Sequence, residues 1–197
     1  MGLIIGFIRR GRLKNLTVLI LNRWYYIFIS LVIKVVHGYI LLSFNDFLTP
    51  LYSFILVILQ YLFLFLFIYN NRKYPYIWLA SLGILANFIV MVFNFGSMPV
   101  TCRILDLAPP SLRMTLLSEG RYYTYTLIDP KTILWFLGDI ILIPFPYRQF
   151  ISIGDILLGL GICMLVQRVM QDGYNGFKRA KGNKIDKKIW DEPESCH

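Results

Sequence analysis

The sequence predicts an all-α integral membrane protein, a helical bundle with four transmembrane helices. Hydrophobic residues make up 57% of the 197 positions and charged residues only 16%, whereas charged residues are about a quarter of a soluble domain. The apolar positions gather into stretches long enough to cross a bilayer, and the basic residues flank these stretches. The net charge is +9, but the basic residues do not form a groove interleaved with aromatic residues. This excludes a nucleic-acid partner.

The first element is a short apolar stretch over residues 2–8, followed by arginines and a lysine at 9–23. It is far shorter than the roughly 20 residues that a spanning helix needs. We therefore expect an interfacial element held by its basic residues at an anionic lipid surface.

Four spans are predicted, at about 24–42, 51–69, 76–93 and 150–166. In the first, Lys34 and His37 are three residues apart and share one helical face. Lys34 either snorkels to the interface or turns into the bundle and neutralises a carboxylate. The second span is featureless apart from Gln60 and is predicted to be structural and lipid-facing. In the third, Asn87 either bonds a neighbouring helix or belongs to a site.

The segments after the third span are predicted to lie outside the cell. The run N-F-G-S-M-P-V begins at Asn94 and marks a turn, in which Gly96 is free to take a positive φ. An extracytoplasmic cap follows over 95–131. Residues 132–143 are apolar but too short to span, which predicts a re-entrant segment.

Counting basic residues gives the orientation. One side of the predicted membrane, residues 9–23, 70–75 and 168–197, holds fourteen Lys and Arg, and the other side, residues 43–50 and 95–149, holds five. The positive-inside rule places the richer side in the cytoplasm. This predicts a multi-pass protein of the cell membrane with both termini cytoplasmic, a single membrane domain over 1–167 and a basic cytoplasmic tail over 168–197.

Two acids, Asp139 and Asp155, are the candidate catalytic residues. Each is preceded by Gly and followed by a long apolar run, and an acid at the edge of a bilayer is costly enough to suggest a function. Two facing carboxylates can share a proton, so that one acts as general base on a water and the other as general acid. Alternatively each acid caps its own helix, since S-I-G-D at 152–155 has the pattern of a capping box and Gly138-Asp139 can begin a short helix.

Five further residues are candidates for binding or positioning a substrate: Lys34, Asn87, Asn94, Gly96 and Arg148. The two histidines and three cysteines have no metal-ligand spacing, and no nucleotide or nucleophile motif occurs. We therefore expect no metal or cofactor.

Three runs carry a family resemblance: the N-terminal G-L-I-I-G-F-I-R-R-G-R-L-K-N-L, then N-F-G-S-M-P-V, and the segment from L-G-D-I-I to S-I-G-D-I-L-L. Together they resemble small bacterial polytopic membrane proteins of unknown function, in which N-G-G-x-M-P-V precedes S-I-G-D. Phe95 stands at the first Gly of N-G-G. The resemblance implies a bacterial cytoplasmic-membrane protein and no particular activity.

A weaker similarity is to lipoprotein signal peptidases, which have four spans and two catalytic aspartates near the outer face. Asp139 and Asp155 match those aspartates in position, and Asn87 in L-A-N-F is placed like that family's Asn. Val90 stands where an acid is expected.

Two functions follow. One is an intramembrane aspartate-dyad hydrolase or peptidase acting on a membrane peptide or lipid-linked substrate. The other is a non-catalytic scaffold, assembly factor or sensor that binds a partner through its cap.

Overall fold

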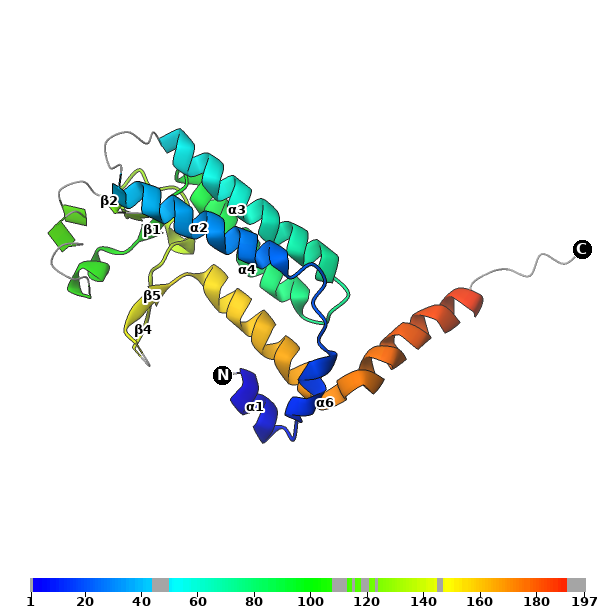
Figure 1. The fold of residues 1–197 in the computed structure, drawn as a ribbon. Coiled ribbons are helices and arrows are strands. Elements are labelled where there is room, and N and C mark those ends of the chain that lie inside the picture. Colours follow the sequence, from blue (N-terminus) through cyan, green and yellow to red (C-terminus); the bar gives the residue numbers. More distant parts are fainter. Residues whose placement is uncertain are drawn as a thin grey trace, which may run out of the picture. The chain divides into compact units, whose positions relative to one another are not determined.

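The computed structural model describes residues 2–43, 50–107, 113–114, 116–117, 121–122, 124–144 and 147–190. The α-helices of this part are α1 (Gly2–Ile8), α2 (Tyr25–Ser43), α3 (Pro50–Asn71), α4 (Ile77–Phe93) and α6 (Ile153–Trp190) (Figure 1). Short 3-10 helices occur at η1 (Leu13–Val18), η2 (Cys102–Asp106) and η3 (Trp135–Leu137). The protein is therefore mostly helical, as predicted.

The prediction that the chain is all-α is wrong, because two small sheets are present. In the first, β1 (Met98–Val100) pairs in parallel with β3 (Tyr125–Leu127), which pairs antiparallel with β2 (Arg121–Tyr122). In the second, β4 (Ile141–Ile143) pairs antiparallel with β5 (Gln149–Ile151). Pro144 directly follows β4, and proline cannot donate a ladder hydrogen bond, so the strand ends there.

The predicted re-entrant segment at 132–143 is also wrong. These residues form η3, an isolated parallel bridge between Val100 and Asp139, and then β4. The segment is rich in β-branched isoleucine, which favours a strand. A short apolar run of this length has no periodicity that separates a buried strand from a helix. Pairing with β5 then satisfies the backbone groups that a re-entrant helix would have satisfied internally.

The chain divides into two compact units, which are described separately. The first comprises residues 1–21 and 162–197. Here α1 turns its small residues toward α6, with Gly2 beside Cys163 and Gly6 beside Met170. The Arg12 amide and the Asn15 side chain both donate to the Met170 carbonyl, at 2.9 and 2.7 Å. Much of α1 is exposed and apolar, including Ile4, Phe7 and Ile8.

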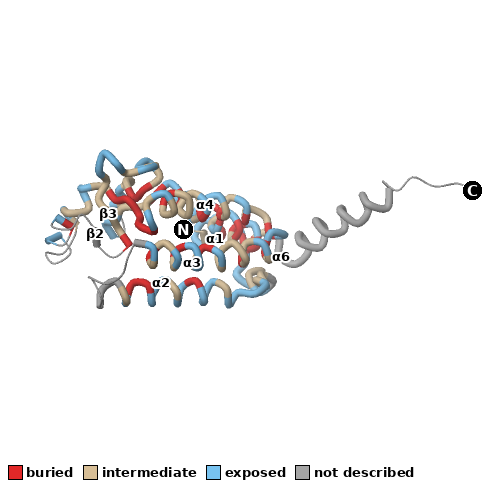
Figure 2. Tube along the Cα trace, turned by 90° about the horizontal axis from the view of Figure 1, so that it is seen from above, coloured by how far each residue is buried: buried red, intermediate tan, exposed pale blue. Residues whose placement is uncertain are grey.

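The second unit comprises residues 22–161, and in it α3 lies between α2 and α4 (Figure 2). Its buried centre is formed by Val57, Tyr61 and Ile84. Figure 2 shows the buried residues of the helices as stripes between exposed ones. Gly83 of α4 meets the backbone of Gly154 and Leu158 in α6. These two helices approach closely because glycine has no Cβ.

Polar contacts join the ends of neighbouring helices. Buried Asn71, at the end of α3, accepts from the Asn22 amide at 2.8 Å and donates to the Asn22 carbonyl at 2.9 Å. At the other end of α3, Gly96 lies against the backbone of Ser53 and Phe54. Consecutive helices α2, α3 and α4 therefore run antiparallel, with the strands at the end where α4 finishes.

Each predicted span corresponds to a helix. For α2, α3 and α4 the bounds agree with the prediction to within a few residues. The last helix begins at Ile153 rather than at 150, because residues 149–151 form β5, and it continues to Trp190 instead of ending at 166. Within the described residues, the stretches Leu51–Asn71 and Ile153–Gln171 are long and apolar enough to cross a membrane, and α2 and α4 are shorter apolar helices.

Candidate acid-pair site

Asp155 forms the capping box that the sequence suggested at the start of α6. The Asp155 amide donates to Ser152 Oγ at 3.0 Å, and the Ser152 amide donates to Asp155 Oδ2 at 3.2 Å. Ser152 is fully buried, so this cap satisfies groups that water cannot reach. Asp155 is thereby fixed in place at the first turn of the helix.

Asn87 of α4 connects the capping box to the rest of the bundle. Its Nδ2 donates to Asp155 Oδ1 at 2.8 Å, and its Oδ1 accepts from Ser152 Oγ at 2.8 Å. Asn87, Ser152 and Asp155 thus close a ring of hydrogen bonds between α4 and the start of α6. Gly154 makes the ring possible, because a Cβ at this position would collide with the Asn87 amide group.

Asp139 is held by backbone pairing and caps no helix, so that alternative is wrong for this acid. Its amide donates to the Pro99 carbonyl at 2.8 Å, and its carbonyl accepts from the Thr101 amide at 3.3 Å. The residue before it, Gly138, lies against the Pro99 carbonyl, and a Cβ there would collide with it. Gly138 and Gly154 therefore serve the same purpose: each lets the backbone beside an acid approach its neighbour closely.

The Asp139 carboxyl group is buried. The residue lies between η3 and β4, outside the long helices. The residue is 8% exposed, and its Oδ1 has no hydrogen-bond partner among the described residues. Burial, together with the negative charge of Asp155, raises the pKa of Asp139 to about 7, while the Lys34 ammonium group opposes the rise. Near neutral pH this carboxyl group can therefore carry a proton.

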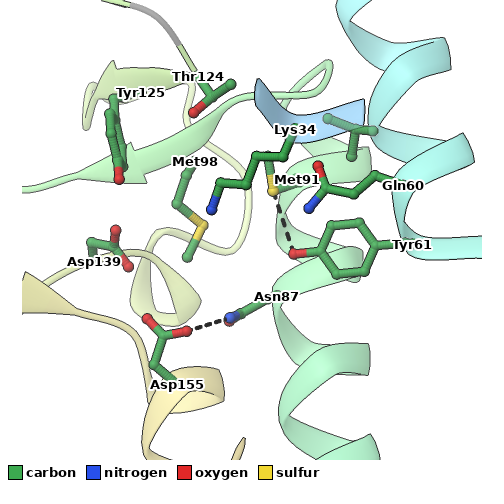
Figure 3. Close-up of a pocket in the computed structure, with 11 residues that line it drawn as sticks. Lys34, Gln60, Tyr61, Asn87, Met91, Met98, Thr124, Tyr125, Asp139 and Asp155 are labelled. Carbon is green, nitrogen blue, oxygen red and sulfur yellow. Dashed lines mark hydrogen bonds between the residues drawn. The ribbon is translucent and has the colours of Figure 1, made fainter. Parts of the chain in front are cut away.

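Asp139 and Asp155 line one pocket between the helices and the strands (Figure 3). The cavity has a volume of about 130 Å³, well above the roughly 10–15 Å³ that holds one water. Four of the predicted site residues meet here, since Lys34 and Asn87 also line the pocket. In Figure 3 the ammonium group of Lys34 points into the cavity, as one of its two predicted alternatives requires, although the residue itself is exposed.

Three predicted site residues are not among those that line this pocket. Asn94 joins the end of α4 to Ile133, accepting from its amide at 3.2 Å and donating to its carbonyl at 2.7 Å. Gly96 takes the predicted positive φ, 81°, in the turn before β1. Arg148 is exposed just before β5.

Several residues that line the pocket were not predicted: Val57, Gln60, Tyr61, Met91, Met98, Thr124 and Tyr125. The prediction that the second span is merely lipid-facing is therefore wrong, because Gln60 and Tyr61 turn one stripe of α3 toward the acids. The adjacent Gln-Tyr pair in the middle of an apolar span was the signal available in the sequence. Among the described residues no group of three His, Cys, Asp or Glu gathers as a metal site.

Fold and site together define a class: a mostly helical protein with two helices long and apolar enough to cross a membrane and a pocket lined by two acids. The chain belongs to a family of unknown function (DUF5317), whose family model matches residues 18–167. The predicted membership of a family of unknown function is thus confirmed.

The chain is also similar to an uncharacterized protein of Thermotoga maritima, with 35% identity over 111 residues. The match covers 55% of this chain and 60% of the relative, less than two thirds of its length. No solved structure matches the chain. The similarity to lipoprotein signal peptidases stays a prediction.

Proposed function

We propose that the chain is a multi-pass protein of the cell membrane in which α2, α3, α4 and the first part of α6 cross the bilayer. Two of these helices have the length and composition for crossing. Large apolar side chains are exposed along α2, α3 and α6, such as Val35, Leu62 and Leu160. A lipid environment would cover such surfaces. The four crossings leave fourteen Lys and Arg on the cytoplasmic side and five on the other.

In this orientation the strands and the mouth of the pocket lie at the outer face. The antiparallel order of α2, α3 and α4 supports this arrangement, because it brings the strands to the end that carries few basic residues. Exposed Trp135 and Phe136 occur at the same end. Aromatic residues of this kind favour the boundary between lipid and water. Water therefore has a short path to the acids.

We propose further that the pocket is the active site of a hydrolase that uses Asp139 as general acid and Asp155 as general base. The observation that carries this proposal is the presence of both carboxyl groups in one cavity. Asp155 takes a proton from a water, whose oxygen bonds to the electrophilic atom of the substrate. As the bond to the leaving group breaks, Asp139 gives its proton to that group. Proton transfer from Asp155 back to Asp139 then restores the pair.

The environments of the two acids suit these roles. Asp139 is buried beside a negative charge and so retains its proton to near-neutral pH. Asp155 accepts hydrogen bonds from Asn87 and Ser152, which fix the direction of its carboxylate. A substrate embedded in the outer leaflet, either a peptide or a lipid-linked molecule, would reach the site from the membrane.

One observation favours the second function, a non-catalytic scaffold that binds a partner through its outer strands. Both oxygens of Asp155 already have partners, as a purely structural cap requires. In that case the pocket would be a consequence of helix packing. The two functions therefore differ in whether the Asp139 and Asp155 side chains take part in any reaction.

The experiment that separates them is hydrolysis in heavy-oxygen water. Membranes containing the wild-type protein, Asp139→Asn or Asp155→Asn are incubated in H₂¹⁸O, and peptide and lipid products are analysed by mass spectrometry. A hydrolase gives ¹⁸O-labelled products with the wild-type protein and with neither variant, although all three fold. Equal labelling in all three samples would contradict the hydrolase and favour the scaffold.

A further inference from the structure

The pocket has two chemically different walls. On one wall, from the strands and α6, lie the carboxyl groups of Asp139 and Asp155. On the other, from α2 and α3, lie the ammonium group of Lys34 and the hydroxyl group of Tyr61, which point into the same space (Figure 3). The first wall accepts hydrogen bonds and the second donates them.

The donors on the second wall are nearly unused. Tyr61 is 7% exposed, and its hydroxyl group donates to the Met91 sulfur at 3.6 Å. A thioether is a weak acceptor, so this contact leaves a buried phenol poorly satisfied. Within the described part of the chain, no hydrogen bond or ion pair engages the Lys34 ammonium group. Lys34 is an exposed residue, so water can reach it, and the group that most needs an acceptor oxygen from a ligand is the Tyr61 phenol. Lys34 would then be a second donor to the same oxygen.

The first wall has the opposite need. Asp139 Oδ1 is buried without a hydrogen-bond partner, and leaving such an atom unsatisfied is costly. With the Asp139 proton on Oδ2, Oδ1 remains an acceptor, and it calls for a ligand group that donates. The best complement to the cavity therefore carries an acceptor oxygen and a donor N–H side by side, with an apolar remainder to contact Val57 and Met98.

We propose that the pocket binds one amide group, whose carbonyl oxygen accepts from Tyr61 Oη and Lys34 Nζ and whose N–H donates to Asp139 Oδ1. An ester lacks the donor that Asp139 needs, and an ammonium ion lacks the acceptor that Tyr61 and Lys34 need. A phosphate would be repelled by two acids. In the hydrolase, Tyr61 and Lys34 would stabilise the oxyanion that develops on the carbonyl oxygen. The proposal names an amide as the substrate class. The reaction of that amide rests on the proposed hydrolase, whereas its binding does not.

The test measures the protection of Asp139 from dicyclohexylcarbodiimide, which modifies buried protonated carboxyl groups. The full chain in detergent micelles is treated near pH 6, and the modified residues are mapped by mass spectrometry. N-Methylacetamide is the amide probe, methyl acetate the ester and methylammonium the cation.

The expected result is that N-methylacetamide protects Asp139 saturably while methyl acetate and methylammonium do not. Tyr61→Phe should raise the half-protecting concentration of the amide about tenfold, because it removes roughly one buried hydrogen bond. Tyr69→Phe is the matched control, because Tyr69 lies on the same helix and is 62% exposed. It should leave protection unchanged.

Three results would overturn the proposal: no protection of Asp139 by N-methylacetamide, equal protection by methyl acetate, or protection that Tyr61→Phe leaves intact. Amide protection without ¹⁸O-labelled products would retain the binding site and reject the hydrolase. Labelled products without amide protection would retain the hydrolase and reject the amide.

Discussion

Gly154 and Asn87 lie so close that a single methyl group on Gly154 would occupy the space of the Asn87 amide. The contact holds α4 against α6 at the level of the pocket, and the Asn87 side chain in turn holds Asp155. The position of one acid therefore depends on a residue that has no side chain.

Gly154→Ala should destabilise the protein by about 2–4 kcal/mol, because the new Cβ displaces Asn87 and breaks its bonds to Asp155 and Ser152. Gly159→Ala, in the same helix, is the control, since a Cβ there meets nothing within 4 Å. It should be neutral or stabilising by up to about 1 kcal/mol through helix propensity. Thermal unfolding in micelles compares them, and equal stability of the two variants would contradict the packing described.

Phe95 has a φ of 53°, in the left-handed region, which costs a non-glycine residue roughly 1–2 kcal/mol. It is also 67% exposed. Phe95→Gly should raise the stability by roughly 0.5–1 kcal/mol after the added freedom of the unfolded chain is counted. Phe95→Ala keeps the Cβ and should bring no gain. Chemical unfolding measures both, and a loss of stability in Phe95→Gly would contradict strain at this turn.

The buried Asp139 makes stability depend on pH. Its pKa is about 7 in the folded protein against 3.8 ordinarily, so between these values the folded state binds the additional proton. Stability should therefore fall as pH rises from about 4 to 7, by an amount on the order of a few kcal/mol, and then level off. Asp139→Asn should remove this decline and gain most stability above pH 7. A parallel decline in Asp139→Asn would assign the pH dependence to another group.

Asn71 is fully buried and exchanges two hydrogen bonds with the Asn22 backbone, besides donating to the Phe67 carbonyl at 2.8 Å. Asn71→Ala should cost about 2–4 kcal/mol, because it removes three hydrogen bonds made by one buried side chain. The neighbouring Asn70 bonds only the Leu66 carbonyl of its own helix among the described residues, so Asn70→Ala should cost about 1 kcal/mol or less. Unfolding curves of the two variants in one detergent test the difference.

The helices were predictable because apolar stretches of 17 to 22 residues have few alternatives to α-helix. The strands were not, because the 12-residue apolar run before Pro144 fits a helix or a strand equally well until its partner β5 is known. The capping box at 152–155 is a local motif and could be predicted from spacing alone.

The pocket was only partly predictable. Asp139, Asp155, Asn87 and Lys34 stood out because polar groups are rare in apolar spans. Asn87 and Asp155 are 68 residues apart in the sequence. Their contact depends on how α4 and α6 pack. Tyr61 was missed because its burial follows from the position of α3 between α2 and α4, which the sequence does not give.

The central claim is that Asp139 and Asp155 form one interacting pair, and the most direct test is the pKa of Asp139 with and without the neighbouring charge. Infrared spectroscopy of the protonated carboxyl band, assigned by its loss in Asp139→Asn, gives this value in the full chain. We expect the pKa to fall in Asp155→Asn, since the negative charge of Asp155 contributes to its rise. An unchanged pKa in Asp155→Asn would show that the two acids do not interact and would contradict the pair.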